Sequence, residues 1–451
     1  MDLHLAELSR TIDPVVLGRR IRTARVAAGM TQAQVAAEDI TAAYLSRIED
    51  GQRRPEAGLL ERMATRMGVT LDDLLLDVTR DQRMELQLAV DYAELALASG
   101  DAEGALKAAS NLVSDPAVES VPQLLRAAQR VKAGALENTG DLDGAIVLLE
   151  DLTSEPTPDV TWLKMLIALT RCYRDSGDFP RAIAVGDKAA KTIEDLGLEG
   201  LTEAIQLTVT VAAAQLWQGD TDQAMRTCMR ALAAAEKHGS VLGKASAYWN
   251  ASVVEARRGA VPSAIELARK ALAMFELSDD NRNLANLRSQ LANLHLQLDP
   301  PDPTTALEIL NNMEQEMTWS GSGAWDISFM HVQRARANYL LGDFNEARAS
   351  LARVAETKPD SAPLVEAQWH SLHGRVAFAE GDPEEARQHY RAAILVLSGV
   401  GVDRGAAQLW FELAELLTQA GDNEGAIQAF RSAGASTGFR VSTPTTISTH
   451  A

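Results

Sequence analysis

Residues 374–386 read GRVAFAEGDPEEA, and this spacing of small residues around a Gly-Asp pair decides the fold. Gly374 stands seven positions before Gly381, and Ala386 stands five positions after it. Glycine adopts the left-handed backbone of a tight turn at little cost, and small residues on both flanks let two helices approach closely. The stretch therefore predicts a helical hairpin closed by a Gly-Asp turn.

The same pattern returns along most of the chain. A glycine followed by Asp or Ala, with an alanine five residues later, stands at Gly100, Gly140, Gly177, Gly219, Gly259, Gly342, Gly381 and Gly421. Pro301 takes the place of the glycine in one further unit, which keeps Ala306. The position seven before the turn is small throughout except at Thr170, which is slightly larger, and Leu294. A single hairpin cannot bury its apolar face alone, so about nine units should stack into a solenoid over residues 79–435.

These residues resemble the signature of tetratricopeptide repeats, although their spacing of 37 to 42 residues is longer than the family's usual repeat. The resemblance implies a right-handed α-solenoid. The Ser- and Thr-rich residues 436–451 are expected to form a disordered tail.

Composition supports an all-α protein, because alanine and leucine dominate and only 5% of residues are aromatic. Cys172 and Cys228 lack metal-like spacing and are expected to be buried thiols in a reducing cytosol. No apolar run is long enough to span a membrane, so a cytoplasmic protein is expected. His370 and His373 could share a metal by spacing, but no further ligand is evident. We predict no metal, no cofactor and no catalytic residue.

Residues 14–78, after an N-terminal extension of residues 1–13, carry a different pattern. Capping residues and apolar periodicity predict five short helices that begin near Pro14, Gln32, Ala42, Pro55 and Leu71. The net charge of the chain is −19, yet residues 15–54 hold seven arginines against four acids. A locally basic head on an acidic body can contact phosphate, because distant charges are screened at physiological salt.

The head resembles the Cro and phage-repressor class of helix-turn-helix domains, the XRE type, in a five-helix, lambda-repressor-like arrangement. The shared positions are Leu17, Gly18, Arg25, Thr31, Gln32, Val35, Ala36, Leu45, Ser46, Ile48, Glu49, Gly51 and Pro55. The resemblance implies that residues 42–50 enter the major groove of double-stranded DNA. It also implies that Arg25 and Glu49 form a buried salt bridge.

The DNA contacts predicted from this resemblance fall into two groups. The resemblance assigns Gln32 to phosphate, and Arg53 and Arg54 would neutralise phosphates after the helix. Ala42, Ala43 and Arg47 match the base-facing positions of the recognition helix, and Thr41 and Tyr44 are also expected to contact DNA. Arg47 can donate two hydrogen bonds to guanine, whereas the alanines offer only methyl contact. An alternative is that the head is a bundle that binds protein.

Two departures from the family pattern concern the turn before this helix. The segment from Gln32 to Thr41 is one residue short, and Glu38-Asp39-Ile40 stands where a turn glycine is usual. These acids would lie close to the DNA.

The resemblance to tetratricopeptide arrays implies that the position six before each turn faces a concave groove. Counted in this way, Arg171, His295, Arg336 and Arg375 line the groove, together with Glu94, Gly134, Ala213, Val253 and Glu415. Trp249 and Asn250 should share that surface. Arginines in register suit a carboxylate or another anion, although they could instead pair with neighbouring acids and bind nothing.

The combined plan resembles that of peptide-sensing quorum regulators. We therefore expect a homodimeric, sequence-specific transcriptional regulator whose repeats sense a peptide or small anionic effector and set the dimer geometry. The alternative is a DNA-tethered scaffold whose repeats bind a protein partner constitutively.

Overall fold

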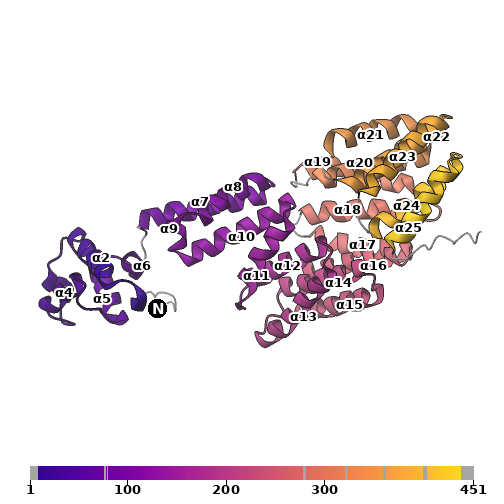
Figure 1. Ribbon diagram of the computed structural model, residues 1–451. Coiled ribbons are helices and arrows are strands. Elements are labelled where there is room, and N and C mark those ends of the chain that lie inside the picture. The colour runs from indigo at the N-terminus through magenta and orange to yellow at the C-terminus, as the bar shows by residue number, and fades with distance from the viewer. Residues whose placement is uncertain are drawn as a thin grey trace, which may run out of the picture. The chain divides into compact units, whose positions relative to one another are not determined.

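The computed structural model describes residues 9–75, 78, 80–277, 281–319, 324–358, 362–399 and 404–437. Most of the predicted extension and tail, residues 1–8 and 438–451, lies outside these ranges. The described residues form helices and turns without a strand, which confirms the all-α prediction. The chain divides into two compact units, residues 1–152 and 153–451, and Figure 1 labels most of their helices.

The first part of unit 1 is the head, and its five predicted helices are present. They are α2 (Pro14–Ala27), α3 (Gln32–Ala36), α4 (Ala42–Glu49), α5 (Ala57–Met67) and α6 (Leu71–Leu75). Asp13 caps α2 by accepting hydrogen bonds from the backbone nitrogens of Val15 (2.7 Å) and Val16 (3.2 Å). Thr31 and Gln34 form a capping box on α3. The helices enclose a core of apolar residues that includes Leu17, Ile21, Val35, Leu45, Ile48, Leu60 and Met63.

The rest of unit 1 contains α7 (Arg80–Ala98), α8 (Ala102–Val113), the short α9 (Pro116–Glu119), α10 (Pro122–Thr139) and α11 (Leu142–Thr153), which ends at the boundary with unit 2. Helices α7, α8 and α10 pack on one another. Val90 and Ala93 of α7 lie in the apolar core that this packing encloses.

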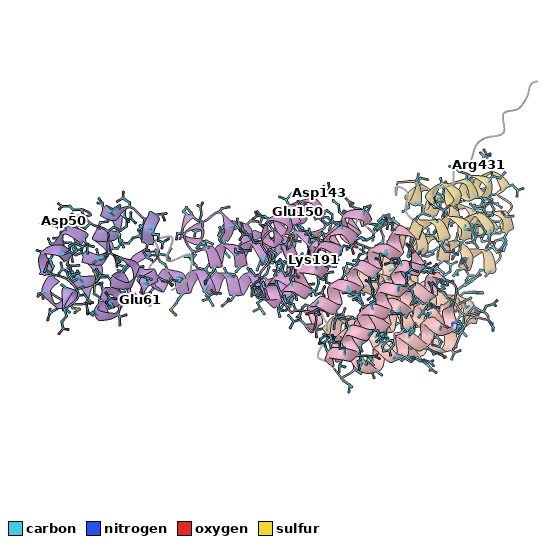
Figure 2. All side chains as sticks on the ribbon, turned by 90° about the horizontal axis from the view of Figure 1, so that it is seen from below. Asp50, Glu61, Asp143, Glu150, Lys191 and Arg431 are labelled. Carbon is cyan, nitrogen blue, oxygen red and sulfur yellow. The ribbon has the colours of Figure 1, made fainter. Side chains whose placement is uncertain are left out.

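Unit 2 consists of consecutive helical hairpins. Their helices are α12 (Val160–Asp175), α13 (Phe179–Asp195), α14 (Thr202–Gln218), α15 (Thr221–His238), α16 (Val241–Arg257), α17 (Val261–Phe275), α18 (Asn281–Leu296), α19 (Pro303–Trp319), α20 (Ala324–Leu341), α21 (Phe344–Thr357), α22 (Pro363–Ala379), α23 (Pro383–Ser398), α24 (Arg404–Gln419) and α25 (Asn423–Ser436). The two helices of each hairpin pack together, and each hairpin packs on the next. Charged side chains such as Lys191 and Arg431 lie on exposed helix surfaces (Figure 2).

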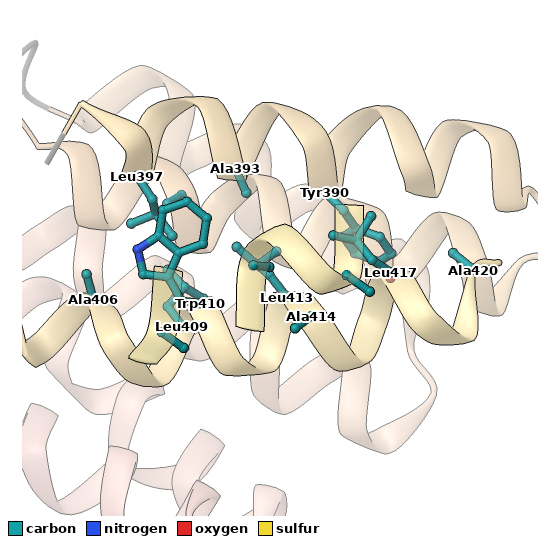
Figure 3. Packing of buried hydrophobic residues seen from close by; sticks show 14 of the residues in the cluster. Tyr390, Ala393, Leu397, Ala406, Leu409, Trp410, Leu413, Ala414, Leu417 and Ala420 are labelled. Carbon is teal, nitrogen blue, oxygen red and sulfur yellow. The ribbon is translucent and has the colours of Figure 1, made fainter. Parts of the chain in front are cut away.

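The Gly-Asp turns work as the sequence predicts. Gly381 has a φ of 91°, and Asp382 caps α23 by accepting hydrogen bonds from Glu384 N (3.1 Å) and Glu385 N (2.9 Å). Ala386 is completely buried. Together with Tyr390, Leu397, Trp410 and Leu413 it belongs to the apolar cluster of helices α22 to α25, part of which is drawn in Figure 3.

The register predicted for the turn between α18 and α19 is wrong by two residues. Asp302 N donates to His295 O across seven residues, whereas the equivalent bond from Asp343 N to Asn338 O spans five. This turn is therefore two residues longer, and Ala292, which is fully buried, occupies the small position instead of Leu294. The groove position counted from Pro301 shifts by the same two residues, from His295 to Asn293.

Candidate functional site

Helix α4, the predicted recognition helix, has one side exposed to solvent and one apolar side packed on the head. Thr41 caps it by accepting a hydrogen bond from Tyr44 N at 3.2 Å. Leu45 and Ile48 are fully buried and fix the helix in the head. The predicted DNA-contacting residues lie along its free side: Thr41, Ala43 and Arg47 are exposed, while Ala42 and Tyr44 are half-buried.

A buried ion pair holds α4 against α2 and α3. Arg25 Nε lies 2.6 Å from Glu49 Oε1, and Arg25 Nη2 lies 3.0 Å from Glu49 Oε2. The exposed fractions of the two side chains are 13% and 2%, which confirms the predicted buried salt bridge. Burial alone would raise the pKa of Glu49, but hydrogen bonds from Arg25 and Gln32 outweigh it, and the pKa is lowered.

Gln32 is part of this network. Its amide Nε2 donates to Glu49 Oε2 at 2.9 Å. An amide nitrogen carries two hydrogens, so one donor remains for the phosphate contact that the sequence predicts. The Arg25–Glu49 pair thereby also sets the orientation of the Gln32 side chain.

The two arginines that follow α4 have different environments. Arg54 donates to the carbonyl oxygens of Ser9 (2.8 Å) and Ile12 (2.5 Å), so it holds the segment before α2. Arg53 is exposed, and within the described residues its guanidinium makes no hydrogen bond. The sequence treats both as phosphate contacts; the structure leaves Arg53 as the more available of the two.

Asp39 of the acidic turn before α4 is neutralised from within the head. Asp39 forms ion pairs with Arg62, at 2.9 Å, and with Arg66, both on α5. The hydrogen bond from Arg66 is the main cause of the lowered pKa of Asp39. Ala37 takes the positive φ, 43°, that a turn glycine would otherwise take. Asp39 therefore serves to attach the turn to α5.

On the repeats, Trp249 and Asn250 lie on α16 and are both engaged. Trp249 Nε1 donates to Gln290 Oε1, and Gln290 Nε2 donates to Ser252 Oγ at 2.9 Å. Asn250 Nδ2 donates to Ser246 O of its own helix at 2.9 Å. The indole also meets Phe275 edge-on, with ring centroids 5.9 Å apart. Trp249 therefore holds α16 against α17 and α18, and an effector contact at these two residues would have to share their polar atoms.

Two of the predicted groove arginines come together. Arg375 Nη2 lies 3.0 Å from Glu412 Oε2. Arg336 is half-buried, and its guanidinium has no hydrogen bond or ion pair to any described residue. Burial lowers the pKa of Arg336, the nearby charge of Glu412 opposes this, and the like charge of Arg375 adds to it. Two cations therefore share one carboxylate on helices α20, α22 and α24.

The remaining groove candidates lie apart from this pair. Arg171 is half-buried on α12 and has interaction partners of its own. His295 is 5% exposed, and its Nδ1 lies 3.1 Å from Asp302 Oδ2, so it stabilises the long turn instead of lining a groove. Sequence reasoning missed Glu412, which stands nine residues before Gly421 instead of six.

His370 and His373 have a neighbour that sequence spacing did not show. His389 of α23 approaches both: its Nδ1 lies 3.1 Å from His370 Nδ1, and its ring stacks on His373 with centroids 4.9 Å apart. Burial is the main cause of a lowered pKa at all three, to about 4 for His373. Among the described residues no group of three or more His, Cys, Asp or Glu has the arrangement of a metal site.

Two further predictions concern the state of the cysteines and the presence of a membrane-spanning helix. Cys172 and Cys228 are free and buried, as predicted, and burial raises the pKa of Cys228 to about 12. None of the described helices combines the length and apolar character needed to cross a membrane.

The fold and these sites define a helix-turn-helix head joined to tetratricopeptide-type repeats. A helix-turn-helix domain family matches residues 16–76, and a tetratricopeptide repeat family matches residues 332–399 and 371–438. Both modules identified from the sequence are thus confirmed, and the first implies DNA binding. No curated protein matches the chain significantly.

Several solved structures share the repeat architecture. A Rap protein complexed with competence and sporulation factor is 14% identical, with a TM-score of 0.51, and the match covers 88% of this chain and 99% of that chain. Bacillus thuringiensis PlcR, in complex with the peptide PapR7 and DNA, is 15% identical with a TM-score of 0.38 over 62% and 99% of the two chains. NprR in complex with its cognate peptide NprX is 13% identical with a TM-score of 0.43 over 77% and 89%. At these identities the likeness concerns the fold alone.

Proposed function

We propose that this protein is a sequence-specific transcriptional regulator of the XRE type whose repeats sense an effector bearing a carboxylate. The effector is a peptide with a free C-terminus or a small anionic ligand, and its binding sets the geometry of a homodimer. The observation that carries this proposal is Arg336, a half-buried cation beside Arg375 and Glu412 without a hydrogen-bond acceptor among the described residues.

The head supplies the DNA contacts. Arg47 is exposed on the free side of α4 and can donate two hydrogen bonds to guanine O6 and N7. Arg53 and the free donor of Gln32 contact phosphates on either side. Ala42 and Ala43 distinguish few bases, so a second head on a second half-site completes the specificity.

The groove supplies the effector contacts. A carboxylate placed between Arg336 and Arg375 restores charge balance, because Glu412 neutralises only one of the two cations. The pair joins α20 and α22, so a bound anion draws neighbouring hairpins together. An effector that favours one dimer geometry by about 1–3 kcal/mol is enough for a useful response.

The solved repeat proteins with bound peptides resemble this chain in fold alone. The proposal of a carboxylate-bearing effector is therefore based on the side chains of this chain. Helix-turn-helix and tetratricopeptide modules are typically non-catalytic. The competing function, a DNA-tethered scaffold, predicts a protein partner that copurifies in stoichiometric amount whatever the conditions.

Replacing Arg47 and Arg53 separately should distinguish base contact from phosphate contact. Arg47→Ala should cost about 1–3 kcal/mol of binding free energy on the operator and relax preference at one base pair. Arg53→Ala should weaken binding to all duplexes alike and reduce the slope of log K against log salt by about one. Fluorescence anisotropy over a salt series measures both. Arg431→Ala, an exposed arginine on α25, is the control. An Arg53 variant with reduced affinity but an unchanged salt slope would contradict phosphate contact.

The double variant Arg336→Ala, Arg375→Ala should abolish the effector response and leave basal operator affinity unchanged. The probe is a pool of random heptapeptides with free C-termini, compared with the same pool amidated, and the readout is operator affinity. We expect only the pool with free C-termini to change operator affinity, and only for the wild type and the control variant. The control is Arg226→Ala, which removes an exposed arginine of α15. Equal action of the amidated pool would rule out the carboxylate contact.

A further inference from the structure

Helix α7 exposes a continuous apolar stripe. Met84, Leu88, Tyr92 and Leu95 retain 64%, 68%, 72% and 65% of their accessible surface. Their spacing of four, four and three residues places them along one face of the helix. Large exposed apolar side chains occur singly on most protein surfaces, but four in a row on one helix mark a contact surface.

The opposite face of α7 already forms the core. Val90 and Ala93 are buried against α8 and α10. Because α7 is the first helix of the array, no earlier hairpin covers the apolar stripe. The first helix of a repeat array normally carries a polar outer face, which keeps the array soluble. The stripe of α7 departs from this rule, and burying each of its side chains fully would contribute about 1.5–3 kcal/mol.

We propose that the stripe is the dimer interface, formed by α7 and the α7 of a second copy packed antiparallel. The stripe is nearly symmetric about its own midpoint, between residues 89 and 90. A two-fold axis there places Met84 opposite Leu95 of the second copy, and Leu88 opposite Tyr92. A self-complementary patch of this kind is what an isologous two-fold contact requires.

Charge also favours the antiparallel arrangement. Glu85 and Asp91 flank the stripe and are exposed. In a parallel pair each acid would stand at the same height as its own copy, and like charges would repel. In the antiparallel pair Asp91 stands at the height of Leu88, and Glu85 stands at the height of Glu94, whose carboxylate is already paired with Arg130. Neither acid of the flanks therefore meets its own copy.

The spacing of the two heads agrees with this geometry, and here the inference rests on the proposed DNA binding. Helix α7 has 19 residues, so its ends are about 28 Å apart. The heads join the N-terminal ends of the two helices and therefore emerge at opposite ends of an antiparallel pair. This separation approaches the roughly 34 Å between half-sites one DNA turn apart. Arg83 links α7 to the head through ion pairs with Asp72 (2.5 Å) and Asp73 (3.3 Å) of α6.

The first test is the oligomeric state of the full chain. By sedimentation equilibrium we expect a dimer for the wild type, and at least a roughly 100-fold higher dissociation constant for Leu88→Asp, because two charges enter an apolar contact. Leu395→Asp, an equally exposed leucine of α23, is the matched control and should dimerise like the wild type. A monomeric wild type, or a Leu88→Asp variant that dimerises as the wild type does, would overturn the proposal.

Oxidative cross-linking tests the antiparallel direction. The double variant Met84→Cys, Leu95→Cys should form covalent dimers, because each new thiol faces the other type across the interface. Each single variant should remain uncross-linked, since identical positions lie far apart. Cross-linking of either single variant would indicate a parallel pair and overturn the antiparallel one. The native cysteines are buried and provide the background measurement.

Binding to a single half-site separates this inference from the proposed function. Leu88→Asp should bind a duplex carrying one half-site as the wild type does, and lose the added affinity of two half-sites. A wild type that dimerises through α7 but binds neither duplex would refute DNA regulation and leave the interface standing. A Leu88→Asp variant that keeps the two-site advantage would refute the interface and leave DNA binding standing.

Discussion

Glu49→Gln is expected to destabilise the head by about 3–5 kcal/mol and to abolish operator binding at 37 °C. The variant removes the charge that Arg25 faces at 2.6 Å, with the Glu49 side chain only 2% exposed. Breaking a buried pair by removing one partner leaves the other charge uncompensated in a poorly solvated place. The same change leaves one acceptor oxygen where two carboxylate oxygens stood, so Arg25 and Gln32 cannot both keep their hydrogen bonds to residue 49.

Hydrogen exchange at the α4 amides measures this effect locally, because the repeats would dominate a global unfolding signal. Glu61→Gln is the matched control: it makes the same chemical change at an exposed site on α5 (Figure 2). We expect fast exchange of α4 in Glu49→Gln and unchanged exchange in Glu61→Gln. Equal protection in the two variants would show that the pair does not hold the recognition helix.

The same pair predicts how the stability of the head depends on pH. The pKa of Glu49 is lower in the folded head than its ordinary value of about 4.3. A lowered pKa means that Glu49 contributes stability above its unfolded pKa, and that this stability is lost as the pH falls through the folded pKa. The wild-type head should therefore weaken in acid more steeply than the Glu49→Gln head.

The repeat turns could be predicted from sequence because their chemistry is local. Gly381 and Asp382 determine the turn through a positive φ and a side-chain cap within three residues. The turn near Pro301 was misjudged because Asp302 keeps the capping role while two extra residues precede it. Counting from a cap cannot reveal an insertion before it, and so His295 was assigned to the groove.

The features that sequence did not show depend on distant partners. Arg54 reaches carbonyl oxygens 42 and 45 residues earlier, and Asp39 pairs with arginines 23 and 27 residues later. Neither contact follows from hydrophobic periodicity. Periodicity predicts which residues share one face of a helix, but it does not predict which distant segment packs on that face. Arg336 and Arg375 were found by register, but their shared carboxylate, Glu412, lies outside that register.

At Gly374 the two helices of one hairpin, α22 and α23, approach so closely that a larger side chain is expected to destabilise the protein. A Cβ added at Gly374 would lie 2.3 Å from Cε1 and 2.6 Å from Cδ1 of Tyr390. Tyr390 is 1% exposed and packs in the cluster shown in Figure 3, so its ring cannot move aside. Gly374→Ala should therefore cost about 1–3 kcal/mol through overpacking and should displace its neighbour Arg375.

The preceding hairpin supplies the compensating change. There the equivalent positions hold Ala335 and Leu351, both fully buried, so an alanine is accommodated when its partner is a leucine. Thermal unfolding should show that Tyr390→Leu added to Gly374→Ala recovers most of the lost stability, a favourable coupling in the double-mutant cycle. Gly399→Ala, whose added Cβ would meet no atom closer than 3.5 Å, is the control and should be close to neutral. If the two changes were simply additive, the close approach of α22 and α23 would not be what requires glycine. Coupled recovery would instead mean that the place of Arg375 in the groove is set by the size of a buried side chain on the paired helix.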